Sequence, residues 1–170
     1  MEQVMRGTGA AASVQVTNVP GAGGTVGLPQ FVNQWKGQSN ALMVGGMVMV
    51  GAIIANKAPV KLTATTPIAR LTGEALAVVV PAESPFKTLG DMIAAMKADA
   101  TKVPIAGGSA GGSDHILAGL MAKAAGADPT KISYVAFAGG GPATAAILGN
   151  QVAAGISGYG EFAEQIKAGK

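Results

Sequence analysis

The sequence predicts an α/β fold in which a mostly parallel sheet is covered by helices on both faces. Two observations lead to this prediction. Short runs rich in β-forming residues alternate with helical patterns along the chain, an order typical of strand–helix–strand units. Glycine-rich turns follow the expected strands, at residues 20–24, 45–46, 107–113, 139–141 and 157–160. Because open α/β sheets bind ligands beyond the carboxyl ends of their strands, these turns are the candidate site.

The hydrophobic periods and the turn residues place the individual elements. We expect strands at residues 13–18, 41–44, 67–72, 75–80, 103–106, 132–137 and 151–156. Helices are expected near the start of the chain and at residues 25–35, 46–56, 88–97, 113–125, 143–148 and 161–168. Thr88 is the expected N-cap of its helix, and Gly126 is the expected stop of another. The proline-containing stretch at 80–85 separates residues 1–80 from residues 81–170.

The composition excludes several classes of function. A chain of 170 residues with 49% hydrophobic residues suits one domain or two small lobes. Charged residues make up 12%, about half the usual share, and the net charge of +3 is too small and scattered for nucleic-acid binding. The absence of cysteine excludes disulfides and thiolate metal sites. No signal peptide opens the sequence, and the longest apolar run, residues 41–55, is too short to span a bilayer.

Residues 102–126 are the stretch with the clearest functional signal. An expected strand at 103–106 leads through a glycine- and serine-rich turn at 107–113 into an amphipathic helix. The apolar residues expected to face the core from this helix are Ile116, Leu117, Leu120 and Met121. The turn places backbone N–H groups and the hydroxyls of Ser109 and Ser113 at a helix N-terminus, where an anion can bind without lysine or arginine.

A purely structural interpretation of the same stretch stays open. The glycines can serve only for a tight turn and for close helix–sheet packing. In that interpretation Ser113 or Asp114 caps the helix. His115, the single histidine, is expected to be a packing or capping residue on the same helix.

An enzymatic alternative comes from Gly107 to Gly111, which match G-x-S-x-G between a strand and a helix. Ser109 would then be the nucleophile of a serine hydrolase acting on a carboxylate ester. However, no histidine follows His115, whereas in α/β-hydrolases the histidine comes after the acid. We expect no metal or cofactor, because the sequence has neither a dinucleotide-binding glycine motif in register nor a P-loop. The four aspartates after residue 90 also lack metal-ligand spacing; they are Asp91, Asp99, Asp114 and Asp128.

Several motifs occur in a fixed order along the chain. They are NVPGAGG at residues 18–24, TLGDMI at 88–93, GGSAGGSDH at 107–115, YVAFAGGGPA at 134–143, LGNQV at 148–152 and IKAG at 166–169. In this order they resemble the periplasmic solute-binding receptors of tripartite tricarboxylate transporters, the Bug (TctC-like) family. The resemblance covers nearly the whole chain.

This resemblance implies a two-lobed, periplasmic-binding-protein-like fold of class II, the Venus flytrap, with parallel-dominated sheets. Residues 1–80 would form an incomplete first lobe and residues 81–170 a nearly complete second lobe. The implied function is capture of a small carboxylate in the periplasm and its delivery to the membrane components of the transporter, without catalysis. The implied ligand-binding residues are Ser109, Ala110, Gly111, Gly112, Ser113, Ala138, Gly139, Gly140, Gly141 and Ser157.

The sequence also departs from the family pattern. Members open with a strand and a Pro-Gly-Gly turn, and they continue after Lys-Ala-Gly with a strand and helices that return to the first lobe. Neither segment has a counterpart here, so we expect the chain to be part of a longer one. In addition, Phe137-Ala138 replaces an aromatic–basic pair, which leaves no side-chain cation at this position.

Overall fold

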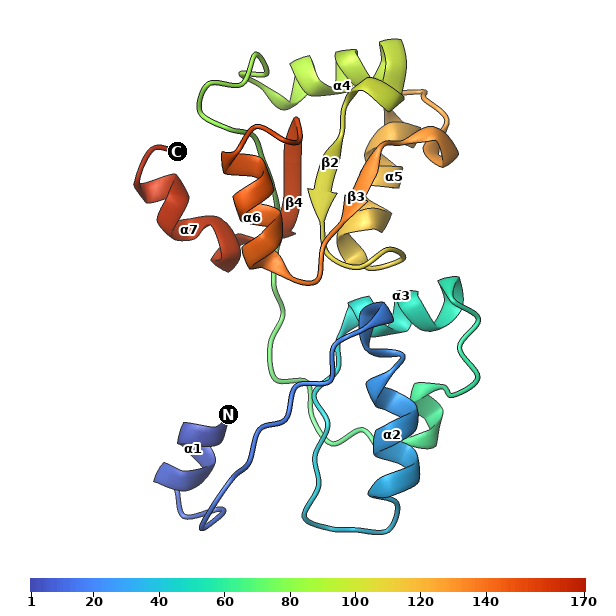
Figure 1. Cartoon of the computed structure of the whole chain (residues 1–170), viewed down its shortest axis with the longest axis vertical. Helices are drawn as coiled ribbons and strands as arrows, with labels where there is room; N and C mark the ends of the chain where they lie inside the picture. Colours follow the sequence, from blue (N-terminus) through green and yellow to red (C-terminus); the bar gives the residue numbers. More distant parts are fainter.

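The computed structural model describes residues 1–170, which form two parts (Figure 1). The N-terminal part, residues 1–75, contains only helices and connections. Its elements are α1 (Glu2–Gly7), η1 (Ala22–Gly24), α2 (Gly27–Gln34), α3 (Met47–Ala55) and η2 (Leu62–Ala64). The sheet unit, residues 76–170, contains all four strands. No helix in either part is long and apolar enough to span a bilayer.

The sheet unit alternates strands and helices, as expected. Its elements are β1 (Leu76–Val79), α4 (Leu89–Asp99), η3 (Ala100–Lys102), β2 (Ile105–Gly107), α5 (Ser113–Ala124), η4 (Pro129–Lys131), β3 (Tyr134–Ala136), α6 (Gly140–Leu148), β4 (Ala154–Gly158) and α7 (Tyr159–Lys167). The strand order is β1-β4-β2-β3. β2 pairs in parallel with both β3 and β4, and β1 pairs antiparallel with β4. The prediction of a parallel-dominated α/β sheet is therefore confirmed.

Helices cover both faces of this sheet. Neighbouring residues of a strand point to opposite faces, so each strand contributes to the core on both sides. Ile105, fully buried, belongs to a core cluster formed with residues of α4 and α5. Ala106, the next residue, belongs to a second cluster formed with residues of α6 and α7. The period-two alternation of β2 thus divides the hydrophobic core into two layers.

The orientation of α5 differs in part from the expectation. Met121 is buried, but Ile116 and Leu120 are 48% and 56% exposed. The stripe that faces the sheet contains Ala118 and Ala122, both fully buried. Small side chains let a helix lie close to a sheet, so the larger apolar residues of α5 are displaced to its flanks.

Three of the expected strands are wrong. Residues 13–18, 41–44 and 67–72 form no strand and make no backbone–backbone hydrogen bond. A strand needs a neighbouring strand to satisfy its N–H and C=O groups, and the N-terminal part offers none. The β-forming residues of these segments are accordingly exposed: Val16 at 64%, Val44 at 66% and Ile68 at 79%.

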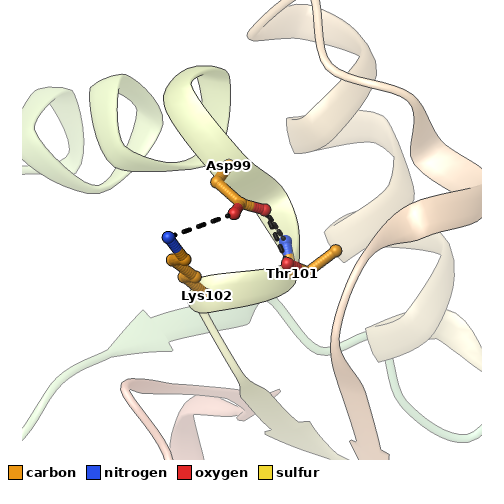
Figure 2. Close-up of polar contacts among 3 residues, drawn as sticks. All are labelled: Asp99, Thr101 and Lys102. Carbon is orange, nitrogen blue, oxygen red and sulfur yellow. Dashed lines mark hydrogen bonds and ion pairs between the residues drawn. The ribbon is translucent and has the colours of Figure 1, made fainter.

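Two similar connections lead from helices into β2 and β3. In the first, Asp99 Oδ1 accepts hydrogen bonds from Thr101 N and Oγ1, at 3.0 and 2.6 Å, and Lys102 Nζ lies 3.6 Å from Asp99 Oδ2 (Figure 2). In the second, Asp128 Oδ1 accepts from Thr130 N and Oγ1, at 2.9 and 2.7 Å. Each aspartate thereby fixes the turn that directs the chain into its strand.

The helix ends in this unit follow the sequence signals. Thr88 caps α4 in a capping box: Thr88 Oγ1 accepts from Asp91 N at 3.2 Å, and Thr88 N donates to Asp91 Oδ2 at 2.8 Å. Gly126 follows α5 with a φ of 77°, in the left-handed region that glycine favours. Both predictions are confirmed.

Candidate ligand-binding site

The candidate site lies where the parallel strands end. In Figure 1 the carboxyl ends of β2 and β3 point toward the N-terminal part, and the connections to α5 and α6 begin there. Phe137 N donates to Gly107 O at 2.9 Å, which joins the ends of these two strands. The predicted residues that follow β2 and β3 therefore lie at one edge of the sheet. Ser157 lies within β4, opposite Ala77 of β1.

The turn between β2 and α5 is held partly by its own backbone. Gly112 N donates to Ser109 O at 2.9 Å, and Gly111 adopts a φ of 79° that favours glycine. Gly112 is the N-cap of α5, and no side chain caps the helix there. The expectation that Ser113 or Asp114 is the cap is therefore wrong, because the helix begins at Ser113, earlier than either role requires.

Three side chains add hydrogen bonds to the turn. Asp114 Oδ2 accepts from Gly108 N at 2.8 Å, and His115 Nδ1 accepts from Gly111 N at 3.0 Å. The Tyr134 hydroxyl donates to Gly108 O at 2.7 Å. The rings of His115 and Tyr134 are stacked, with centroids 4.3 Å apart and an interplanar angle of 18°. The expected packing or capping role of His115 is confirmed.

Burial and the nearby Asp114 carboxylate raise the pKa of the Tyr134 hydroxyl above its usual value. Tyr134 therefore remains a hydrogen-bond donor throughout the neutral range. Its close approach also explains a glycine: a Cβ at Gly107 would overlap the Tyr134 hydroxyl and lie 3.0 Å from Asp114 Cβ. Gly107 is thus required by packing rather than by its backbone conformation.

Five backbone N–H groups of this stretch donate no hydrogen bond within the protein; they belong to Ser109, Ala110, Ser113, Asp114 and His115. The last three form the N-terminus of α5, where unpaired N–H groups and the helix dipole favour an anion. Ser109 Oγ makes no hydrogen bond, whereas Ser113 Oγ donates to Asp114 Oδ1 at 3.0 Å. Ala110 is the exposed residue of the turn.

Helix α3 of the N-terminal part packs on this turn. A Cβ at Gly51 would overlap Gly111 O, and a Cβ at Gly111 would lie 2.7 Å from Ala55 Cβ. Val48 lies against Gly112, which is buried. Glycines at 51 and 111 are therefore what allows α3 to approach so closely. The predicted ligand turn lies at the junction of the two parts of the molecule.

Two neighbouring turns have carboxylates of the protein itself beside them. The Glu161 carboxylate lies against Gly140, at the start of α6, so closely that a Cβ there would overlap it. The Glu74 carboxylate lies in the same way against Gly158, the N-cap of α7. Both positions are helix N-termini, where negative charge is favoured. Ala138, Gly139 and Gly141 are exposed.

The geometry does not arrange Ser109, His115 and Asp114 as a nucleophile, base and acid. Ser109 Oγ makes no hydrogen bond with His115, and His115 Nδ1 accepts from the backbone of Gly111. The Asp114 carboxylate accepts from Gly108 N and Ser113 Oγ rather than from the imidazole. A triad requires the acid to orient the histidine, so no observation favours the hydrolase alternative. No three His, Asp or Glu side chains are grouped as they would be around a metal ion.

Sequence reasoning identified the turn but missed what holds it. Tyr134 is 26 residues from Gly108, and their contact depends on the pairing of β2 with β3, in which Ile105 lies opposite Tyr134. No local pattern reveals that register. Glu161 was missed for the same reason, since its neighbour Gly140 lies in a different strand–helix connection.

The chain thus has an α/β fold with a candidate ligand site where its parallel strands end. The family model described as "Tripartite tricarboxylate transporter family receptor", TctC, matches residues 4–170. The chain belongs to this family. The recognition made from the sequence motifs is therefore confirmed.

Solved structures agree on the fold. A TctC solute-binding protein from Polaromonas has 24% identity and a TM-score of 0.64, with 93% of this chain and 53% of that chain covered. A structure described as a periplasmic transporter has 26% identity and a TM-score of 0.51, with 56% of this chain and 31% of that chain covered. The chain thus spans about half the length of the Polaromonas protein. No curated protein matches the chain.

Proposed function

We propose that the chain is part of a periplasmic solute-binding receptor that captures a small organic carboxylate for the membrane components of a tripartite tricarboxylate transporter. The observation that carries this proposal is the set of unused N–H groups at the N-terminus of α5, at the junction of the two parts. The expected boundary at residue 80 falls after β1, which pairs with β4 in the sheet unit, so we assign residues 1–75 to one lobe and residues 76–170 to the other. The ligand lies between them, as the two-lobed arrangement requires.

A carboxylate suits the donors that the turn offers. Residues 107–113 contain no lysine or arginine, so backbone N–H groups and the Ser109 hydroxyl are the donors of the turn. A hydrogen bond to a charged group contributes about 1.5–3 kcal/mol, and a helix N-terminus adds about 0.3–1 kcal/mol. Three such contacts offset much of the cost of association, which is at least about 4 kcal/mol.

The turns on either side support the same ligand chemistry. Glu161 and Glu74 bring carboxylates to the N-termini of α6 and α7. These contacts indicate that the strand-end turns accommodate carboxylate groups. In this proposal a second carboxylate of the ligand displaces Glu161 from the turn formed by Ala138, Gly139, Gly140 and Gly141, and Ser157 contributes from β4.

Amide NMR of the 15N-labelled 170-residue chain tests the proposal, because it detects weak binding and locates it. Succinate and citrate are titrated separately, with succinamide as the uncharged control. We expect saturable shifts of the amides of Ser109 to Ser113 with the acids but not with the diamide. Glu161→Gln keeps the shape of the side chain without its charge, so it should strengthen binding if a ligand carboxylate reaches Gly140. Absence of any saturable shift with either acid, or shifts centred elsewhere, would overturn the proposal.

A further inference from the structure

We propose that Asp114, His115 and Tyr134 are positioning residues that hold the backbone of the ligand turn, and that His115 must be unprotonated at Nδ1 to do so. This inference rests on the proposed function for its consequence, ligand affinity. The positioning itself can be measured without ligand. The three residues come from two elements, α5 and β3, so they connect the shape of the turn to the sheet.

The turn needs this support because its own backbone supplies little. Within residues 108–112 the single backbone–backbone hydrogen bond is that from Gly112 N to Ser109 O. Three of the five residues are glycines, whose backbone is conformationally permissive. The contacts from α3 involve the side chains of Val48 and Ala55 and the backbone of Gly51. None of them is a hydrogen bond, so they do not fix the direction of an N–H group.

The three side chains grip the peptide groups at both ends of the turn. Gly108 is held through its N–H by Asp114 and through its carbonyl by Tyr134, at 2.8 and 2.7 Å. Gly111 is held through its N–H by His115. Ser109 and Ala110 lie between these fixed points, with N–H groups that donate no hydrogen bond within the protein. Asp114 and His115 therefore accept from the N–H groups of Gly108 and Gly111, and the N–H groups of Ser109 and Ala110 are left for a ligand.

The protonation state of His115 follows from the geometry. A ring nitrogen that accepts from an N–H group carries no proton itself, so the Gly111 bond requires the neutral imidazole with its proton on Nε2. Protonation would place two donors, His115 Nδ1 and Gly111 N, against each other. Tyr134 stacks on the ring. The preceding residue, Asp114, has its carboxylate on Gly108 N, and α3 contributes no titratable residue. Acidification is therefore expected to release the Gly111 end of the turn.

Protonation of His115 has two opposite expected effects on ligand affinity, so the direction of the change tests the proposal. An imidazolium near the turn would also attract a carboxylate ligand through its charge. If His115 acts by positioning, affinity falls as the imidazole is protonated. If it acts as a cation for the ligand, affinity rises.

NMR of the full 170-residue chain provides the ligand-free readouts. The expected result is a scalar coupling between Gly111 N and His115 Nδ1 across their hydrogen bond, with the coupling lost as the imidazole protonates. Tyr134→Phe keeps the stacked ring and removes only the bond to Gly108 O, so the hydrogen-bonded amides of Gly108 and Gly111 should exchange faster with solvent. Thr130→Val removes a hydroxyl from the connection into β3, whose bond is to Asp128, and serves as the matched control.

Affinity for succinate gives the functional readout. Tyr134→Phe is expected to weaken it by about two- to tenfold, the range of one net hydrogen bond, with Thr130→Val unchanged. The proposal is overturned if the coupling is absent at neutral pH, if Tyr134→Phe leaves exchange at the turn unchanged, or if affinity rises on protonation of His115. If the wild-type chain binds no carboxylate while the coupling and the exchange effect are present, the proposed function fails and the positioning stands.

Discussion

The two parts of the molecule are stabilised to very different extents. Before Leu76 the buried residues are Leu28, Met49 and Ala52, and no strand forms. The sheet unit contains both hydrophobic clusters, of ten and five buried residues. Since burial of apolar surface is the main favourable term in folding, the sheet unit carries most of the stability of the chain.

The two parts also contribute to the candidate site in different ways. The sheet unit fixes the ligand turn by directed hydrogen bonds from Asp114, His115 and Tyr134. The N-terminal part contributes α3, which contacts the same turn through Val48, Gly51 and Ala55 without a hydrogen bond. Hydrogen bonds fix the geometry of the turn. The contacts with α3 include no hydrogen bond, so α3 can separate from the turn. This suits a ligand that must enter between them.

The largest expected effect concerns the core of the sheet unit. Ile105 is fully buried at the centre of the larger cluster, so Ile105→Ala should lower the free energy of unfolding by about 2–5 kcal/mol. Ile54 on α3 is 75% exposed, and Ile54→Ala should change it by no more than about 0.5 kcal/mol. Urea unfolding followed by circular dichroism measures both. Equal losses in the two variants would contradict the assigned difference between the parts.

The next effect concerns the contact between the parts. Gly51→Ala places a methyl group where Gly111 O lies, and such overpacking costs about 1–3 kcal/mol. We expect α3 to detach from the turn, with faster amide exchange in α3 and unchanged exchange in β2. Gly119→Ala is the matched control, because it is also a helical glycine but its Cβ would meet only Pro129 Cβ at 4.0 Å. Slow exchange retained in α3 of Gly51→Ala would show that the contact does not hold the helix.

The sequence predicted the strands of the sheet unit well, because this is the part of the chain that buries its apolar residues. There the period-two and helical patterns coincide with burial, and strands near 103–106 and 132–137 were found within two residues as β2 and β3. In the N-terminal part, Val16, Val44 and Ile68 carry β-forming side chains, but no partner strand exists to make strands of those segments. β-propensity alone therefore gave wrong strand predictions where no partner strand was present.

In the candidate site, too, the sequence predicted the local features but not the long-range contacts. The glycines and serines of the turn are contiguous in sequence and were recognised as a unit. Tyr134 reaches Gly108 only through strand pairing, and α3 reaches Gly111 only through packing of separate parts. Such long-range contacts leave no local signal in a single sequence. The ligand-binding residues themselves remain predictions.

A smaller effect is expected at the start of α4. Thr88 caps this helix, whereas α1, α2 and α3 have no side-chain cap. Thr88→Ala should cost about 1 kcal/mol, within the range of about 0.5–2 kcal/mol for lost caps. Thr25 precedes α2, and its hydroxyl donates to Ala22 O in η1 rather than capping the start of α2, so Thr25→Ala is the control. Thermal unfolding distinguishes them, and an equal shift of the two midpoints would show that the capping box contributes nothing of its own.

The smallest effect expected is the response to acid, which also distinguishes the two parts. Hydrogen bonds from Thr101 side chain and backbone lower the pKa of Asp99 from 3.8, and those from Thr130 do the same for Asp128; both aspartates belong to the sheet unit. A carboxylate with a lowered pKa in the folded state stabilises the protein above its unfolded pKa, and this contribution is lost as the pH falls through the folded value. Stability should therefore decline below about pH 3.8, the unfolded value. Both groups are exposed, so the decline should be shallow.

Asn substitutions test this assignment, because they remove the titrating carboxyl while keeping an oxygen that can accept from the threonine. In Asp99→Asn and Asp128→Asn, urea midpoints should be lower than in the wild-type chain at neutral pH and should converge with it in acid. Glu83→Gln, at an exposed position in the connection between β1 and α4, is the matched control and should follow the wild-type curve. A wild-type curve that stays flat below pH 3.8, or Asn variants that keep their deficit in acid, would show that these carboxylates do not connect protonation to the stability of the sheet unit.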